Sequence, residues 1–188
     1  SALSLTVQNP TPALSSLAPA SLAAASPTTL LTINGTNFTR ETQLSVNGSP
    51  APRTIVSASQ LTTSLPAELF TLSGFVRIQV LNPAPSQTGS SNGDSSNTLQ
   101  LEIFNPVPTL TSVNPVFAPI GGRAPADSVT LTLVGTNFVR NSVARIATTV
   151  AGAPTTDLPT SYRSRDTLTV RILAADWRAG AYNITVLN

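Results

Sequence analysis

Apolar and polar side chains alternate along most of this chain. Every second residue is apolar in three clear stretches, Val129–Leu133, Leu168–Ile172 and Tyr182–Val186. A period of two turns one side of a strand toward a core and the other toward solvent, so the pattern predicts half-buried antiparallel strands. The 16 prolines and 10 glycines interrupt the chain at short intervals, which argues against long helices. We therefore predict an all-β protein.

The predicted strands are short and closely spaced. Those in the first half are Ala13–Leu17, Thr29–Asn34, Gln43–Val46, Thr54–Ser57, Gln60–Ser64, Gly74–Leu81 and Thr98–Phe104. Those in the second half are Leu110–Asn114, Ser128–Val134, Val143–Ile146, Asp166–Ile172 and Gly180–Leu187, with one more expected within Thr148–Ser164. Two segments between strands, Pro66–Leu69 and Ala174–Trp177, are candidates for single helical turns. About seven short strands in roughly 90 residues are typical of an immunoglobulin-like sandwich.

The sequence contains an internal repeat, whose two copies are out of phase with the ends of the chain. The tetrapeptide Gly-Thr-Asn-Phe occurs at Gly35–Phe38 and again at Gly135–Phe138. The opening pattern Leu3–Pro10 returns 96 residues later as Leu99–Pro106, which closes the first repeat. The chain thus begins with what resembles the last strand of a repeat, and it reaches Asn188 before that strand recurs.

This phase predicts three parts. Residues 1–9 form an N-terminal strand that resembles the last strand of a repeat, either a donor strand or the strand of a preceding domain. Residues 10–104 form a first sandwich, and residues 105–188 form a second sandwich that lacks its own final strand.

The repeated motifs resemble the IPT/TIG family of immunoglobulin-like domains, in its bacterial extracellular form. A Pro-x-Leu-x-Ser-x-x-Pro pattern, at Pro12–Pro19 and Pro108–Pro115, precedes an alternating strand that ends in Gly-Thr-Asn-Phe. The resemblance implies two tandem immunoglobulin-like sandwiches without chemistry of their own. Domains of this family serve in bacterial surface proteins, beside polysaccharide-acting enzymes, in plexin-type receptors and in dimerising transcription factors.

The residues of the tetrapeptide have structural explanations. We expect Gly35 and Gly135 to supply a left-handed or tightly turned backbone where a strand ends. Asn37 and Asn137 are expected to hydrogen-bond within their own turns. Phe38 and its counterpart in the second copy are expected to be buried in equivalent places of the two cores.

The amino-acid composition argues against several classes of function. All 10 cations are Arg and they are scattered, whereas a nucleic-acid binder needs a clustered basic face. No apolar run approaches the ~18 residues of a membrane span. Without His or Cys there is no Ser-His or Cys-His nucleophile and no ligand set of the usual kind for zinc or copper, and the 8 carboxylates show no paired motif. We therefore predict no enzymatic activity, no cofactor and no metal, and a Ser/Thr/Asn-rich surface suggests an extracellular or cell-surface protein.

Weaker candidates remain in the loops and among the aromatic residues. Asn92–Asn97 has oxygen ligands at alternate positions, but a single carboxylate is fewer than calcium sites use. Trp177, Tyr162 and Tyr182 are candidates for a sugar platform, although core packing explains them as well. The long polar segment Ser86–Ser96 is expected to be the most mobile part of the chain.

The favoured function is that of an extracellular structural protein, a subunit of a pilus-like surface fibre that binds copies of itself head to tail. Leu3, Leu5 and Val7 would be the donor strand for a neighbouring copy. The acceptor strand would be that of Tyr182, Ile184 and Val186. The alternative is an adhesin or polysaccharide-binding accessory module from a longer chain, whose partners are neighbouring domains or surface carbohydrate. The sequence leaves open whether Ser1 is a mature terminus.

Overall fold

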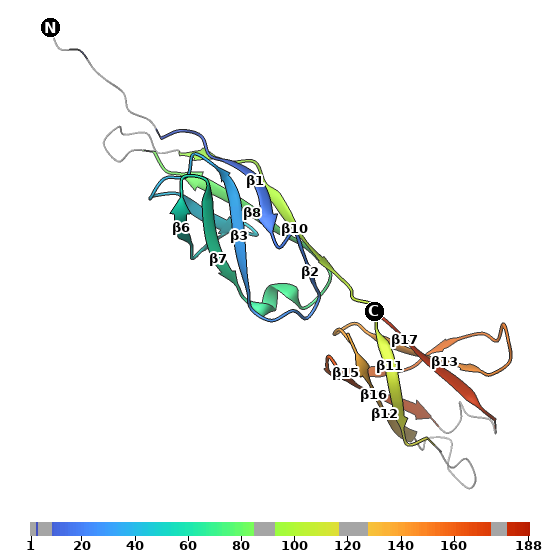
Figure 1. Cartoon of the computed structure of the whole chain (residues 1–188). Coiled ribbons are helices and arrows are strands. Elements are labelled where there is room, and N and C mark those ends of the chain that lie inside the picture. Colours follow the sequence, from blue (N-terminus) through green and yellow to red (C-terminus); the bar gives the residue numbers. More distant parts are fainter. Residues whose placement is uncertain (1–2, 4–8, 85–92, 117–127, 174–179) are drawn as a thin grey trace. The chain divides into compact units, whose positions relative to one another are not determined.

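The computed structural model of the chain contains two compact units, Ser1–Phe104 and Asn105–Asn188 (Figure 1). It describes residue 3 and residues 9–84, 93–116, 128–173 and 180–188. Each unit is built from strands in two sheets, and all described pairings are antiparallel except that of β2 with β10, which is parallel. This agrees with the predicted all-β, immunoglobulin-like fold.

The first unit pairs its strands in two sheets that face each other across one core. One sheet has the order β1 (Ala13–Ala18), β3 (Thr29–Thr36), β7 (Gln60–Leu65) and β6 (Thr54–Ser57). The other has the order β2 (Ser21–Ala23), β10 (Leu99–Phe104), β8 (Gly74–Asn82), β4 (Gln43–Val46) and β5 (Ser49–Ala51), and β9 (Asp94–Ser95) also pairs with β8. A 3-10 helix, η1 (Ala67–Phe70), links β7 to β8.

The alternation seen in the sequence fills the core of the first unit. Strand β8 buries Val76, Ile78 and Val80 and turns the residues between them toward solvent. Facing it across the sandwich, β3 buries Leu31 and Ile33. The single turn of η1 adds a completely buried Phe70.

The second unit repeats this strand order with fewer strands in one sheet. Its four-stranded sheet has the order β11 (Thr109–Asn114), β12 (Ser128–Thr136), β16 (Thr167–Leu173) and β15 (Thr160–Ser164). The other sheet has the order β14 (Thr156–Asp157), β13 (Val143–Thr148) and β17 (Tyr182–Leu187). Strands β13 and β17 thus correspond to β4 and β8, and no described residue of this unit forms a counterpart of β10.

The two units also share the details of strand register. The pairing of β1 with β3 shifts between Leu14 and Ser16, and that of β11 with β12 shifts between Leu110 and Ser112. Each first strand is followed by a cis peptide bond before proline, at Pro19 and at Pro115. The backbone features of the first unit therefore recur in the second, as the sequence repeat does.

The structure corrects two explanations given above for the Gly-Thr-Asn-Phe motif. The glycines do not supply a left-handed backbone; they allow a close approach, because a Cβ on Gly35 would lie 2.2 Å from the carbonyl oxygen of Ala13. The left-handed residue of each motif is the asparagine, with a φ of 62° at both Asn37 and Asn137. Their side chains do not bond within their own turns, since Asn37 donates to the carbonyl oxygen of Thr11 at 2.8 Å.

The same bond recurs in the second copy, where the amide of Asn137 donates to the carbonyl oxygen of Val107 at 3.0 Å. Each asparagine thereby ties its turn to the segment that enters the first strand of the unit. The expected burial of the aromatic residue is confirmed, because Phe38 is 5% exposed and Phe138 is 0% exposed.

Several short elements differ from the prediction. The strands β2, β5 and β9 were not predicted, and the region Thr148–Ser164 holds two strands rather than one. The first helical turn is present as η1, whereas Ala174–Trp177 lies outside the described residues. Part of the segment Ser86–Ser96 is not a free loop, because β9 pairs with β8 and the buried Ser96 hydroxyl accepts from the backbone N–H of Val80 at 3.1 Å.

Candidate functional site

The edge of β17 is the main structural difference between the two units. In the first unit, β8 is paired on both sides, with β4 and with β10. In the second unit, the described residues pair β17 on one side only, with β13. One row of β17 backbone N–H and C=O groups therefore faces outward without a strand, which is the geometry that admits an added strand.

Side-chain burial shows the same difference. On β8 the inward residues Val76, Ile78 and Val80 are at most 2% exposed, whereas Ile184 and Val186 at the corresponding positions of β17 are only half-buried. In the first unit the neighbouring strand β10 contributes Leu101 and Ile103, which are 0% and 3% exposed. Among the described residues, none covers the second core at the place where β10 covers the first.

The far end of β17 is anchored by the partly buried Asn188, as the end of β8 is by the buried Asn82. The amide of Asn82 donates to the carbonyl oxygens of Pro10 and Asn37 at 2.7 and 2.8 Å, and its Oδ1 accepts from the Thr42 hydroxyl at 2.5 Å. At the corresponding position, Asn188 makes three bonds of the same kind.

The partners of Asn188 match those of Asn82 in kind. Its amide donates to the carbonyl oxygens of Pro106 and Asn137 at 2.6 and 2.7 Å, and its Oδ1 accepts from the Ser142 hydroxyl at 2.6 Å. We call this arrangement the asparagine clamp. Because the clamp is formed in both units, the end of β17 is held in place without a strand on its outer edge.

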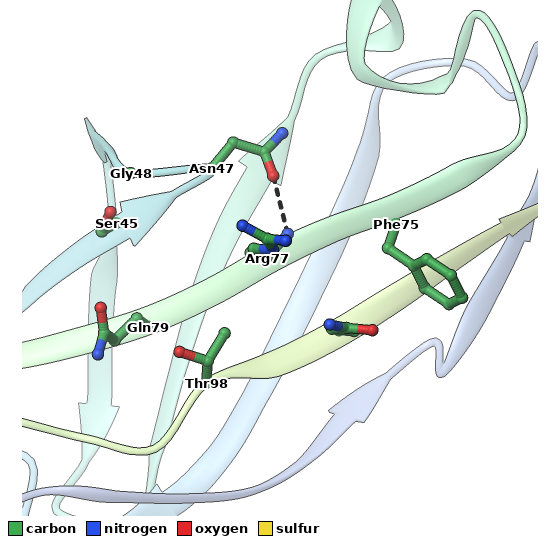
Figure 2. Close-up of a pocket in the computed structure, with 8 residues that line it drawn as sticks. Ser45, Asn47, Gly48, Phe75, Arg77, Gln79 and Thr98 are labelled. Carbon is green, nitrogen blue, oxygen red and sulfur yellow. Dashed lines mark hydrogen bonds between the residues drawn. The ribbon is translucent and has the colours of Figure 1, made fainter.

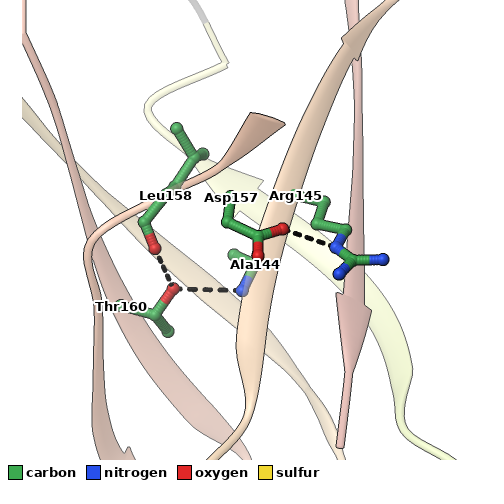
Figure 3. A network of polar contacts seen from close by, with 5 residues as sticks. All are labelled: Ala144, Arg145, Asp157, Leu158 and Thr160. Atoms are coloured by element: carbon green, nitrogen blue, oxygen red, sulfur yellow. Dashed lines mark hydrogen bonds and ion pairs between the residues drawn. The ribbon is translucent and has the colours of Figure 1, made fainter. Parts of the chain in front are cut away.

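The opposite edge of the short sheet is closed by local contacts (Figure 3). Strand β14 pairs with β13, and the side chains of Arg145 and Asp157 form a salt bridge of 2.5 Å across this pair. The Thr160 hydroxyl donates to the carbonyl oxygen of Leu158 at 2.7 Å and accepts from the N–H of Ala144 at 3.0 Å. The ion pair is exposed and so contributes little stability, but together these bonds cover the β13 edge and leave β17 as the open one.

The structure describes all three predicted acceptor residues but only one of the three predicted donor residues. Tyr182, Ile184 and Val186 alternate along the inward side of β17, and the last two pack against the core of the second unit. Leu3 is 99% exposed, while Leu5 and Val7 lie outside the described residues. The pairing of the donor residues therefore stays a prediction.

A second feature, which the sequence analysis missed, is a groove on the outward face of the first unit (Figure 2). It has a volume of about 740 Å³ and lies over β4, β8 and β10. Its lining residues are Ser45, Asn47, Gly48, Phe75, Arg77, Gln79, Thr98 and Gln100. The alternation Phe75, Arg77, Gln79 on β8 was visible in the sequence, but only the pairing of β4 and β10 with β8 brings the other polar residues beside it.

At the weaker candidate sites from the sequence, the described residues form no arrangement that would bind a metal or a sugar. Asp94 belongs to β9 and accepts from the Thr11 hydroxyl at 2.7 Å, while Asn92 lies outside the described residues. No cluster of three metal-binding side chains exists in the part of the chain that the structure describes. Tyr162 packs against the core and Trp177 lies outside the described residues.

The described part of the chain also holds no helix that is both long and apolar enough to cross a membrane.

Comparison with known proteins gives a family match for the first unit. Residues 12–97 match the model described as the IPT/TIG domain. No protein with a curated description matches the chain.

Among solved structures, the chain is similar to the extracellular region of plexin A4, domains 1 to 10, with 17% identity and a TM-score of 0.34. That match covers 89% of this chain and 13% of the plexin chain. A protein crystallised with a xylogluco-oligosaccharide matches with 14% identity and a TM-score of 0.42, over 95% of this chain and 41% of the other. The chain thus spans less than half the length of either structure.

Proposed function

Residues 12–97 form an IPT/TIG domain, and from this premise we propose that the chain is an extracellular structural protein whose copies join head to tail by β-strand addition. Residues 1–9 of one copy add to the open edge of β17 in the second unit of the next. The observation that carries the proposal is this edge, to which no described residue adds the strand that β10 provides to β8. The IPT/TIG family is generally non-enzymatic, in keeping with a structural role.

The first unit supplies a template for the register of the added strand. Strand β10 runs antiparallel to β8 and places Leu99 opposite Ile78 and Leu101 opposite Val76. The pattern at Leu3–Pro10 matches that at Leu99–Pro106. Transferred to the second unit, this register puts Leu3 opposite Ile184 and Leu5 opposite Tyr182.

The chemistry of the donor segment fits the opening. Leu3, Leu5 and Val7 have the spacing of two that turns all three toward the same side of a strand. Burying each of these side chains would contribute roughly 1.5–3 kcal/mol, and each new ladder hydrogen bond about 1 kcal/mol. Part of this gain is offset by the ordering of the segment and by association.

Such a contact is heterologous, because it joins one end of a copy to a different surface of the next. A heterologous contact that does not close into a ring propagates into a filament. The competing source of the missing strand is a segment that follows Asn188 in a longer chain, which would fill the same opening within one molecule.

Cysteine cross-linking tests both the contact and its register, and the chain has no cysteine of its own. In the template, Gln100 lies opposite Arg77, which corresponds to Ser4 opposite Asn183. Paired residues on neighbouring antiparallel strands have Cα atoms about 4.5–5.5 Å apart, within disulfide reach. The double variant Ser4→Cys with Asn183→Cys should therefore form a ladder of disulfide-linked oligomers on mild oxidation.

The matched control is Gln8→Cys with Asn183→Cys, which moves the donor cysteine four residues, or about 13 Å, along the strand. This variant should remain largely monomeric in a denaturing gel. Equal ladders from both variants, or a cross-linked product the size of one chain, would refute the head-to-tail arrangement. Absence of cross-linking from the first variant would also refute it and leave the edge to a following segment.

A further inference from the structure

The groove over β4, β8 and β10 lies on a face of the sheet to which no strand can be added. Its floor is the outward face of three strands whose backbone groups already pair with one another. An occupant must therefore bind through side chains. Its volume of about 740 Å³ lies within the roughly 300–1,000 Å³ of ligand pockets.

The polar groups of the groove are largely unpaired within the protein. The structure gives no hydrogen bond to the side chains of Ser45, Thr98 or Gln100 within the described part of the chain. Asn47 uses only its Oδ1, which accepts from the backbone N–H of Arg77 at 2.8 Å. Donors and acceptors thus line the groove and remain available to a hydroxyl-rich ligand.

Arg77 and Phe75 are the charged residue and the aromatic residue that line the groove. Arg77 is the charged residue among those that line it, and the described residues offer its guanidinium no hydrogen bond or ion pair. Figure 2 shows Arg77 between Asn47 and Gln79, with Phe75 farther along β8. Phe75 is 62% exposed on the same face as this cation, and the exposed Glu102 lies opposite Phe75 on β10.

The second unit shows that the sandwich does not need this pair. Aligning β17 with β8 through the asparagine clamp places Ala181 at the position of Phe75 and Asn183 at the position of Arg77. Strand β17 pairs with β13 as β8 pairs with β4, but β17 itself has neither an aromatic ring nor a cation on its outward face. The cation on that face is Arg145 of β13, which forms an ion pair with Asp157. The pair is therefore an addition to the fold of the first unit.

We propose that this groove binds an acidic polysaccharide, with a uronate ring against Phe75 and its carboxylate on Arg77. The C–H groups on the flat side of a pyranose are attracted to the negative face of an aromatic ring. A guanidinium pairs with a carboxylate through two parallel hydrogen bonds. Ser45, Thr98 and Gln100 hydrogen-bond the ring hydroxyls.

Other ligand classes fit less well. A nucleic acid requires several cations along its path, and the groove offers one. A β-strand requires an open backbone edge, which this face lacks. The site is separate from β17, so its failure would leave the strand-addition proposal untouched, and the reverse also holds.

The test uses the full chain in affinity gel electrophoresis with soluble polygalacturonate in the gel, at about 0.15 M salt. The wild-type protein should be retarded by polygalacturonate. Phe75→Ala and Arg77→Gln should each weaken this binding at least about tenfold. Thermal melts that match the wild type would establish that these surface variants are folded.

Two control variants remove an apolar side chain and a cation at positions outside the groove. Leu30→Ala removes an apolar side chain that is 64% exposed on the other sheet, and Arg40→Gln removes an exposed cation. Both should bind polygalacturonate as the wild type does. Equal losses in these variants would overturn the proposal, as would no retardation of the wild type.

Two further polymers test the ligand class. Dextran sulfate has a higher charge without carboxylates, and hydroxyethyl cellulose has pyranose rings without charge. Weaker binding to both than to polygalacturonate supports a uronate site. Equal retardation by dextran sulfate would show unspecific charge attraction, and equal retardation by hydroxyethyl cellulose with no effect of Arg77→Gln would show a neutral site; either overturns the proposal.

Discussion

Single polar residues hold this cysteine-free sandwich together at its turns. Asn82 is completely buried and makes bonds to the segment before β1, to the Gly-Thr-Asn-Phe turn and to Thr42. These partners are 72, 45 and 40 residues away in the sequence. The clamp therefore closes loops that a disulfide closes in other small domains, and it does so with a side chain that both donates and accepts.

Asn82→Asp should be strongly destabilising, although it only replaces the side-chain NH2 group with an oxygen. An aspartate cannot donate to the carbonyl oxygens of Pro10 and Asn37, and each buried acceptor left without a donor costs about 1–3 kcal/mol. We expect a loss of about 2–6 kcal/mol in the unfolding free energy of the first unit, measured by urea denaturation at pH 7.

Asn47→Asp is the matched control, since Asn47 is exposed and its Oδ1 only accepts a bond from Arg77. Aspartate retains that acceptor, and an exposed change of this kind stays within about 0.5 kcal/mol. Equal destabilisation by the two substitutions would contradict the role given to the clamp.

At the level of strands, β8 and β17 have the same inward residues in kind but different neighbours. In an antiparallel sheet, alternate N–H groups of a strand point to opposite neighbours. Both sets are bonded on β8, whereas on β17 the described structure bonds only the set that faces β13. The difference lies in hydrogen bonding and burial, and it is therefore measurable residue by residue.

Amide hydrogen exchange should be slow throughout β8 but fast at alternate residues of β17 in the isolated chain. A synthetic peptide with the sequence Ser1–Pro10 should slow those β17 amides by filling the open edge. The same peptide carrying Leu5→Arg should have no such effect, because it would place a charge in the core. Uniform protection of β17 without peptide would contradict an open edge.

At the scale of the whole molecule, the proposed contact makes assembly depend on a short terminal segment. Removing Ser1–Gln8 would take away the proposed donor strand, and we expect the second unit, left without it, to be less stable. Strand addition between copies has a concentration-dependent equilibrium, so assembly and second-unit stability are linked.

The deletion of Ser1–Gln8 should abolish filaments seen by electron microscopy and leave monomers in sedimentation velocity. A chain with Ser4→Ala and Thr6→Ala, which changes only the outward-facing positions of the donor strand, should still assemble. Filaments that persist after the deletion would disprove the donor role of this segment.

The sequence by itself determined the elements that depend on local pattern. The period of two located the long strands to within one or two residues, because burial on a strand follows directly from alternation. The Gly-Thr-Asn-Phe motif predicted that Phe38 and Phe138, which follow β3 and β12, are core residues. The tetrapeptide and the Leu3–Leu99 correspondence revealed the repeat, because recurrence at a fixed spacing is visible in the sequence alone. These inferences need no knowledge of which segments become neighbours.

Tertiary structure decided everything that depends on neighbours distant in sequence. Gly135 is required because its backbone meets the carbonyl oxygen of Thr109 on the paired strand β11, where a Cβ would lie only 2.0 Å away. Short strands such as β2 and β5 carry too few residues to show a period, and pairing with β10 and β4 creates them. The groove around Arg77 exists because three separate strands align their outward residues, and the open edge of β17 is visible only where the neighbouring strand is absent. An alternating pattern can be recognised within one segment, whereas a strand partner, a steric clash or an unpaired strand edge depends on how two segments are placed.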